Sequence, residues 1–106
     1  MKYIIEQTNF FKKWIENLKD RNGKYRIMQR ILRMEDGNLG DIKSIDKDLY
    51  EARCFFGPGY RLYFTFKGDV ILLLLIGGDK STQREDINRA REILLSSEVT
   101  KWKQRL

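Results

Sequence analysis

The stretch that most constrains the fold is VILLLLIGG, residues 70–78, in which seven consecutive apolar residues are followed by two glycines. A strand with one solvent-facing side alternates apolar and polar residues, and this stretch does not alternate. It is also much shorter than the ~20 apolar residues that a membrane-spanning helix requires. We therefore predict a central β-strand that is buried on both faces and is ended by Gly77 and Gly78.

Two neighbouring stretches, residues 49–56 and 60–67, do alternate, as half-buried strands do. Their apolar positions can pack together on the helices of the chain. The opposite face of both strands would then be an exposed, mostly cationic sheet surface, consisting of Glu51, Arg53, Arg61, Tyr63 and Lys67. Gly68, in the sequence KGD, is expected to make the tight hairpin turn that joins the second of these strands to the apolar one.

Helical periodicity appears early in the chain, where apolar residues recur at three- and four-residue spacing. A first helix follows an opening strand at residues 1–6, with Thr8 as its capping residue. A second helix covers residues 24–34. The loop around Gly23 is short, so we expect these two helices to form an antiparallel hairpin.

The rest of the chain is expected to contain one irregular stretch, residues 35–48, and a third helix within residues 79–97, with Ser81 or Thr82 as its cap. The basic tail, residues 101–106, is either a frayed end or a contact arm. With 106 residues, the chain is long enough for a single core, and we predict one domain over residues 1–106.

Composition narrows the possible functions. The chain has 21 Lys and Arg against 15 Asp and Glu, a net charge of +6, which favours polyanionic partners such as nucleic acid, although a merely basic domain would look the same. It has no histidine, the usual general base near neutral pH. Its single cysteine, Cys54, excludes an internal disulfide and, in the absence of histidine, leaves no cluster of metal ligands. We therefore predict neither metal nor cofactor, and a reducing cytoplasm.

The predicted cationic face suits a phosphodiester. Arginine binds phosphate through paired hydrogen bonds, so Arg53 and Arg61 are candidate phosphate ligands, and Lys80, just beyond the apolar strand, adds a point charge. Tyr63 could stack on a base or donate to a phosphate oxygen. Glu51 could accept the proton of a ribose 2′-hydroxyl while the cations stabilise the phosphorane, which would need no metal. A lysine or tyrosine with a pKa lowered by the cationic cluster could serve as the base instead.

A structural interpretation stays open beside this one. Glu51 could simply form cross-strand ion pairs with Arg53 or Arg61, and exposed pairs of this kind contribute only about 0.2–1 kcal/mol. Arg30 and Arg33 belong to a basic stretch of the second helix. That stretch is either a solvated helix face or a contact surface for ribosomal RNA or an acidic partner.

Three stretches together resemble a known family: LYEARCFF at 49–56, GPGYRLYF at 57–64 and LLLLIGGDKSTQREDINRA at 72–90. In this order they resemble the RelE/ParE superfamily of toxins from toxin–antitoxin systems, in particular the HigB-like "addiction module killer protein" branch, and the resemblance covers nearly the whole chain. It implies an α+β fold, with an N-terminal helical hairpin packed on a twisted, mainly antiparallel four-stranded sheet and a C-terminal helix.

The resemblance also implies an activity. RelE-like members cleave mRNA on the ribosome through metal-independent attack of the 2′-hydroxyl. Arg61 matches the catalytic strand arginine of that family, and Lys80 matches the basic residue after the apolar strand; Glu51 and Arg53 match charged strand positions. No histidine or tyrosine follows Tyr63, so Lys80 takes the role of the general acid. The expected RNA contacts are Tyr63, Lys67, Arg30 and Arg33.

The expected partners are a cognate antitoxin encoded next door, with a helix-turn-helix, together with mRNA and the ribosome. Operator DNA would be contacted only through the antitoxin complex, and no membrane is involved. Two other functions remain open at this point. A ParE-like member would inhibit DNA gyrase without cleaving RNA, and a nonenzymatic module would only bind nucleic acid or its antitoxin.

Overall fold

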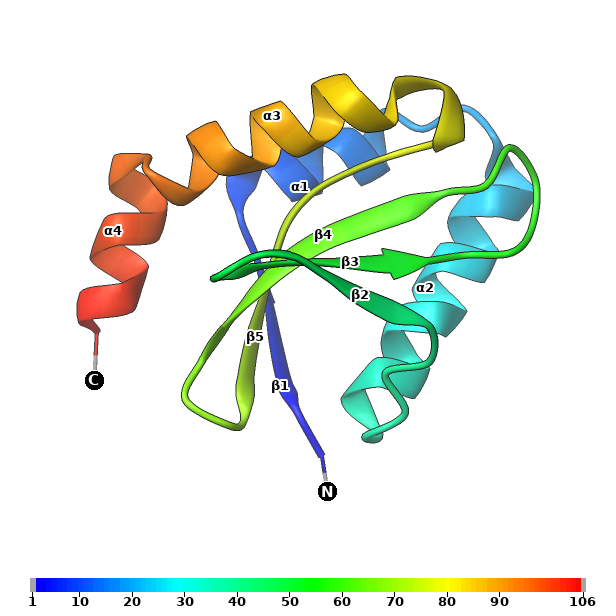
Figure 1. Ribbon diagram of the computed structural model, residues 1–106. Helices are drawn as coiled ribbons and strands as arrows, with labels where there is room; N and C mark the ends of the chain where they lie inside the picture. Colours follow the sequence, from blue (N-terminus) through cyan, green and yellow to red (C-terminus); the bar gives the residue numbers. More distant parts are fainter. Residues whose placement is uncertain (1, 106) are drawn as a thin grey trace.

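A five-stranded sheet with the order β1-β5-β4-β3-β2 forms the centre of the molecule (Figure 1). The computed structural model describes residues 2–105. Strand β1 runs parallel to β5, and all other neighbouring strands are antiparallel. The strands are β1 (Ile4–Gln7), β2 (Ile42–Asp46), β3 (Leu49–Arg53), β4 (Arg61–Lys67) and β5 (Ile71–Gly78). The chain is thus an α+β protein with a mixed sheet.

The predicted count of four strands is wrong, because β2 lies inside the stretch that was expected to be irregular. Its side chains do not alternate between buried and exposed, and the register shifts between Ser44 and Asp46. An edge strand of this kind is defined by its backbone pairing with β3, which leaves no hydrophobic period in the sequence. The hairpin turn at Gly68 is confirmed, with the glycine at a φ of 65°.

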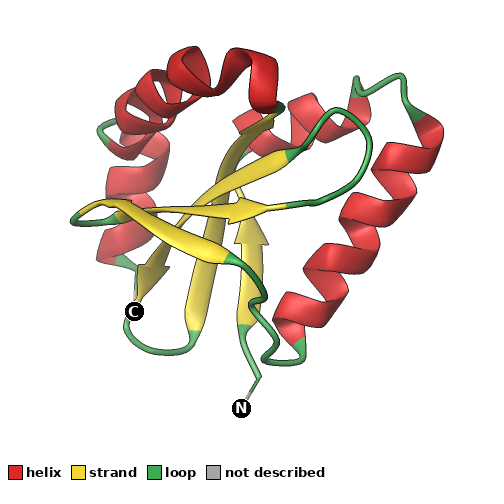
Figure 2. Cartoon of the chain, turned by 45° about the vertical axis from the view of Figure 1, so that its right-hand side comes forward, coloured by secondary structure: helices red, strands yellow, loops and turns green. Residues whose placement is uncertain are grey.

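Four helices complete the fold: α1 (Asn9–Glu16), α2 (Arg21–Glu35), α3 (Gln83–Leu94) and α4 (Ser97–Gln104). Thr8 caps α1 as predicted, its hydroxyl accepting from the backbone N–H of Phe11 at 3.0 Å. Asp20 caps α2 in the same way, 3.0 Å from the N–H of Gly23. The second helix therefore begins before Gly23, and in both views it turns away from α1 rather than folding back along it (Figures 1 and 2).

The last two helices differ from expectation at their boundaries. The segment Lys80–Thr82 is a short 3-10 helix that leads into α3, and Asp79 caps it through the N–H of Ser81. The basic tail is neither frayed nor extended within the described residues. Its residues 101–104 form the second half of α4, in which Trp102 is buried. No helix within residues 2–105 is both long and apolar enough to cross a membrane.

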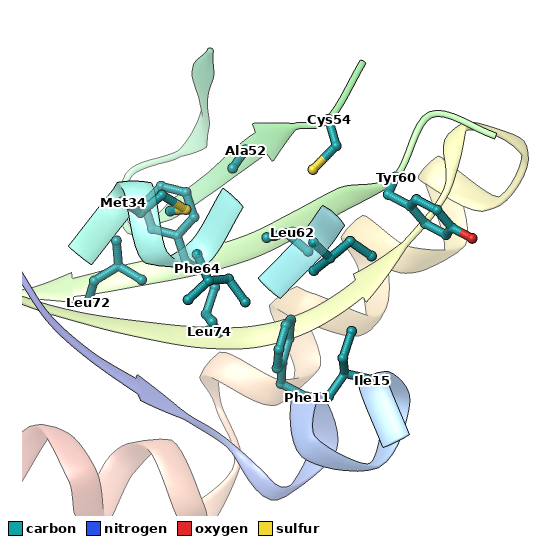
Figure 3. Packing of buried hydrophobic residues seen from close by; sticks show 12 residues of the cluster. Phe11, Ile15, Met34, Ala52, Cys54, Tyr60, Leu62, Phe64, Leu72 and Leu74 are labelled. Atoms are coloured by element: carbon teal, nitrogen blue, oxygen red, sulfur yellow. The ribbon is translucent and has the colours of Figure 1, made fainter. Parts of the chain in front are cut away.

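Helices cover both faces of the sheet (Figure 2). Helices α1 and α2 pack on one face over the alternating apolar residues of β3 and β4, and Figure 3 shows this cluster from close by. Helices α3 and α4 pack on the other face. Strand β5 supplies Leu72 and Leu74 to the first cluster and Leu73 and Leu75 to the second, which confirms the predicted strand buried on both faces.

The prediction of an exposed cationic sheet face is therefore wrong. Helices α3 and α4 cover that face, where Tyr63 is 0% and Glu51 only 1% exposed. Strand β5 is as apolar on this side as on the other, and the sheet can bury it only beneath a second helical layer. Arg53 and Arg61 stay partly exposed at the end of this face where β3 and β4 are joined.

Candidate functional site

The predicted site residues that remain accessible gather where β3 ends and β4 begins. Arg53 and Arg61 are directly paired across these two strands, and Arg61 is also paired with Gly78 at the end of β5. Lys80 lies two residues beyond that strand. The neighbouring strand ends thus place the two arginines and the lysine around the loop that joins β3 to β4, and this loop reaches between α2 and the start of α3 (Figure 1).

A cleft of about 700 Å³ opens between this loop and the three cationic side chains. Its lining contains neither aspartate nor glutamate: it consists of Arg53, Cys54, Phe55, Phe56, Gly57, Pro58, Gly59, Arg61 and Lys80. A cavity that carries cations but no carboxylate in its lining attracts anions, and its size accommodates part of a nucleotide.

Gly59 lies between the side chains of Arg61 and Lys80. It has a φ of 77°, which favours glycine, and its carbonyl accepts from Arg61 Nη1 at 2.8 Å. A Cβ placed on Gly59 would lie 3.4 Å from Lys80 Cβ and 3.5 Å from Arg61 Nη1. Arg61 and the base of the Lys80 side chain therefore flank the same point of the turn.

Glu51 forms a buried ion pair with Arg61. Its Oε2 lies 3.6 Å from Arg61 Nε, and the two side chains are 1% and 11% exposed. The same oxygen accepts from the hydroxyl of Tyr63 at 3.1 Å and from Gln83 Nε2 at 2.8 Å. Arg61 Nε is itself buried without a hydrogen-bond partner among residues 2–105, so the Coulomb attraction of Glu51 compensates its charge.

Two predicted site residues therefore lie beneath the cleft and not in it. Glu51 and Tyr63 are covered by α3, and neither lines the cleft. Burial and the negative charge of Glu51 raise the pKa of Tyr63, which keeps the phenol protonated as a donor. In this arrangement Glu51 positions Arg61 and cannot reach a ribose hydroxyl, and Tyr63 cannot stack on a base.

Arg53 and Lys80 are the more accessible cations. Arg53 is 41% exposed and forms an ion pair through Nε with Asp41 Oδ2 at 3.0 Å. Lys80 is exposed, and across residues 2–105 no carboxylate lies within ion-pair distance of its ammonium group. A flexible, unpaired ammonium at the mouth of a cleft can follow a phosphate or donate a proton to it.

The other predicted RNA contacts are dispersed. Lys67 lies near α4, at the opposite end of β4, and donates to the carbonyls of Trp102 and Arg105 at 2.7 and 3.2 Å. Arg30 is 5% exposed and donates to the Leu39 carbonyl at 2.6 Å, and burial lowers the pKa of its guanidinium. Both contacts order the fold. Arg33, by contrast, is exposed on α2 and lies near the cleft.

Sequence reasoning missed the aromatic residues of the β3–β4 loop. Phe55 is 77% exposed, and Phe56 is partly buried beneath the guanidinium of Arg26, whose central carbon lies 4.2 Å from the ring centroid. A signal was available, because Phe55 continues the polar register of Glu51 and Arg53 next to a Gly-Pro-Gly turn. Residues 2–105 contain no cluster of His, Cys, Asp or Glu that could hold a metal ion.

Comparison with known proteins places the chain among relatives. A protein of Haemophilus influenzae (strain ATCC 51907 / DSM 11121 / KW20 / Rd), itself uncharacterized, is 43% identical over 95 residues, which cover 90% of this chain and 94% of that protein. The chain belongs to the family of this Haemophilus protein. No protein-family model matches the sequence.

A solved structure has a fold similar to that of this chain. The chain is similar to a mutant of the Escherichia coli toxin RelE in the free state, with a TM-score of 0.69 and 15% identity, over 87% of this chain and 97% of that one. At this identity the likeness establishes a RelE-like fold. Function has to be argued from the cleft.

Proposed function

We propose that this chain is the toxin of a type II toxin–antitoxin module, of the HigB-like branch, and a ribosome-dependent mRNA endoribonuclease that uses no metal. The supporting observation is the convergence of Arg61, Lys80 and Arg53 on one cleft without a carboxylate in its lining. The RelE-like fold and the resemblance of the strand segments add to this argument. Residues 1–106 form one toxin domain in this proposal, and its place of action is the cytoplasm.

In this proposal each cation has a role. The 2′-oxygen of a ribose attacks the adjacent phosphorus, the bond to the 5′-oxygen breaks, and a 2′,3′-cyclic phosphate and a 5′-hydroxyl result. Arg61, held by Glu51, and Arg53 stabilise the charge of the phosphorane. Lys80 protonates the leaving 5′-oxygen. Because the cleft lining contains no carboxylate or imidazole, the proton of the 2′-hydroxyl passes to solvent.

The proposed antitoxin must neutralise a cationic cleft. Charge complementarity favours an acidic segment that lies over Arg53, Arg61 and Lys80 and excludes RNA by occupying the same surface. We assign this segment to a helix-turn-helix protein encoded next to the toxin, which would also carry the pair to operator DNA.

The test combines induction in bacterial cells with mapping of mRNA 5′ ends. Lys80→Ala is the informative variant, because an exposed side chain without an ion pair can be removed with the fold intact. Loss of a general acid should reduce cleavage by about 100-fold or more. Arg61→Lys keeps the buried charge opposite Glu51 but loses the guanidinium fork, and should also reduce cleavage. Lys103→Ala, an exposed lysine on α4, is the matched control and should cleave like the wild type.

Two results would contradict the proposal. The first is growth arrest by the wild type without new 5′ ends in translated frames. The second is equal cleavage by the wild type and Lys80→Ala. Inhibition of purified gyrase while mRNA stays intact would instead support a ParE-like activity.

A further inference from the structure

We propose that a second cationic hollow, beside the cleft, binds the neighbouring part of a single-stranded RNA, with one base stacked on Phe55. This inference rests on the proposed nuclease function and extends its substrate site. The second hollow measures about 280 Å³ and lies between α2 and the β3–β4 loop. It shares Arg53, Cys54, Phe55 and Phe56 with the cleft, so the two hollows adjoin each other.

Phe55 is the central observation. A single exposed apolar side chain carries little information by itself, since folded proteins expose many. Phe55, however, is 77% exposed at the boundary between two cationic hollows. The guanidinium carbon of Arg53 lies 5.7 Å from its ring centroid, and the high exposure leaves ring surface for a base. The adjacent Phe56 differs, because Arg26 covers its ring at 4.2 Å.

The charge around Phe55 fits a nucleic-acid backbone. Arg26, Arg30 and Arg33 recur at four- and three-residue spacing on α2, which places them on one helix face toward the hollow. Arg30 is used internally, whereas Arg26 and Arg33 are exposed. Asp41 is the one carboxylate in the lining of this hollow, and Arg53 neutralises it through the ion pair at 3.0 Å.

Single strands fit this combination better than duplexes do. An unpaired base can stack on an aromatic ring while arginines follow the phosphates, and such stacking tolerates any base sequence. In a duplex the base faces are already stacked and cannot reach Phe55. The cleft would then hold the scissile phosphate, and the second hollow would hold the adjoining nucleotide.

The binding test uses the purified full chain and a short RNA in which every ribose is 2′-O-methylated, so that cleavage is impossible. One base is replaced by 2-aminopurine to report stacking. Phe55→Ala and Phe55→Leu should weaken binding by roughly 5- to 150-fold and abolish the quenching of 2-aminopurine, while Phe55→Trp should retain both. Leu95→Ala removes another apolar residue, 85% exposed at the end of α3, and should bind like the wild type.

Arg33→Ala gives an independent readout. Each lost phosphate contact on a single strand should lower the slope of log affinity against log salt concentration by about 0.7, and Lys103→Ala should leave the slope unchanged. Circular dichroism and thermal unfolding of each variant establish that the fold is intact.

The inference is overturned if the wild type does not bind the probe, if it binds duplex equally well, or if folded Phe55→Ala stays within twofold of the wild type. The outcome can be separated from that of the proposed nuclease. Cleavage that depends on Lys80, combined with binding that does not depend on Phe55, would refute the RNA-binding role of the second hollow and support the proposed nuclease. Binding that depends on Phe55, in a protein that cleaves no RNA, would support RNA binding in the second hollow and refute the proposed nuclease.

Discussion

Removing the carboxylate of Glu51 should mainly lower the stability of the fold, because Glu51 supports Arg61 and does not touch the substrate. In Glu51→Ala, Arg61 loses its buried counter-charge, and the donors of Tyr63 and Gln83 lose their acceptor. Breaking a buried ion pair by deleting one partner costs about 3–5 kcal/mol. For a domain of this size that lowers the melting temperature by more than about 10 °C. Glu51→Gln keeps an acceptor oxygen and should cost less, about 1–3 kcal/mol.

A double-mutant cycle measures the coupling directly. Free energies of unfolding from urea denaturation are compared for Glu51→Gln, Arg61→Met and the double variant. If Glu51 exists to hold Arg61, the double variant is more stable than additivity predicts, by more than about 1 kcal/mol, because no unpaired charge remains buried.

The alternative assignment of Glu51 as the general base makes the opposite prediction. If Glu51 acted only as a base and did not support the fold, its removal would leave stability unchanged within about 0.5 kcal/mol, while cleavage would be lost with an altered pH profile. That pair of results, or additivity in the cycle, would refute the positioning role.

Three further predictions concern other parts of the structure. Burial and the hydrogen bond to Asp20 at 2.7 Å raise the pKa of Tyr60 to about 12. Tyr60 therefore stabilises the fold below pH 10, and this contribution is lost as the pH rises to 12. In urea denaturation, Tyr60→Phe should lose about 1.5–3 kcal/mol of stability at neutral pH and should lack this part of the alkaline decline. Equal alkaline declines in both proteins would contradict this. Gly77→Ala places a Cβ against the ring of Trp14 and should cost about 1–3 kcal/mol in denaturant unfolding, a penalty that should shrink when Trp14 is replaced by leucine. Lys80→Ala should unfold within about 0.5 kcal/mol of the wild type, and a larger loss would mean that Lys80 also supports the fold.

Several elements could be predicted because their cause is local. The Thr8 cap, the Gly68 turn and the double-sided burial of β5 depend on neighbouring residues or on a continuous apolar run. Strand β2 could not be predicted, since an edge strand is defined by a partner distant in the sequence. Gly77 and Gly78 were expected only to end a strand, yet Trp14 packs against the first and Asp86 against the second.

The candidate site was predicted in part for the same reason. The alternation of β3 and β4 correctly placed Arg53 and Arg61 on one face, and the end of β5 correctly brought Lys80 to the same edge of the sheet. The alternation could not distinguish solvent from a second helical layer. Glu51 and Tyr63 therefore share a face with the cleft arginines but are covered by α3.

The sequence by itself determined which strands carry the charges and on which side of the sheet each charge lies. It also determined that β5 has to be buried on both faces. The tertiary structure alone decided how far along that side the helices reach. It left Arg53 and Lys80 at the open end and enclosed Glu51 behind Arg61. The physical reason is that a side chain's direction follows from the two-residue period of its own strand, whereas its access to water depends on residues packed over it from distant parts of the chain.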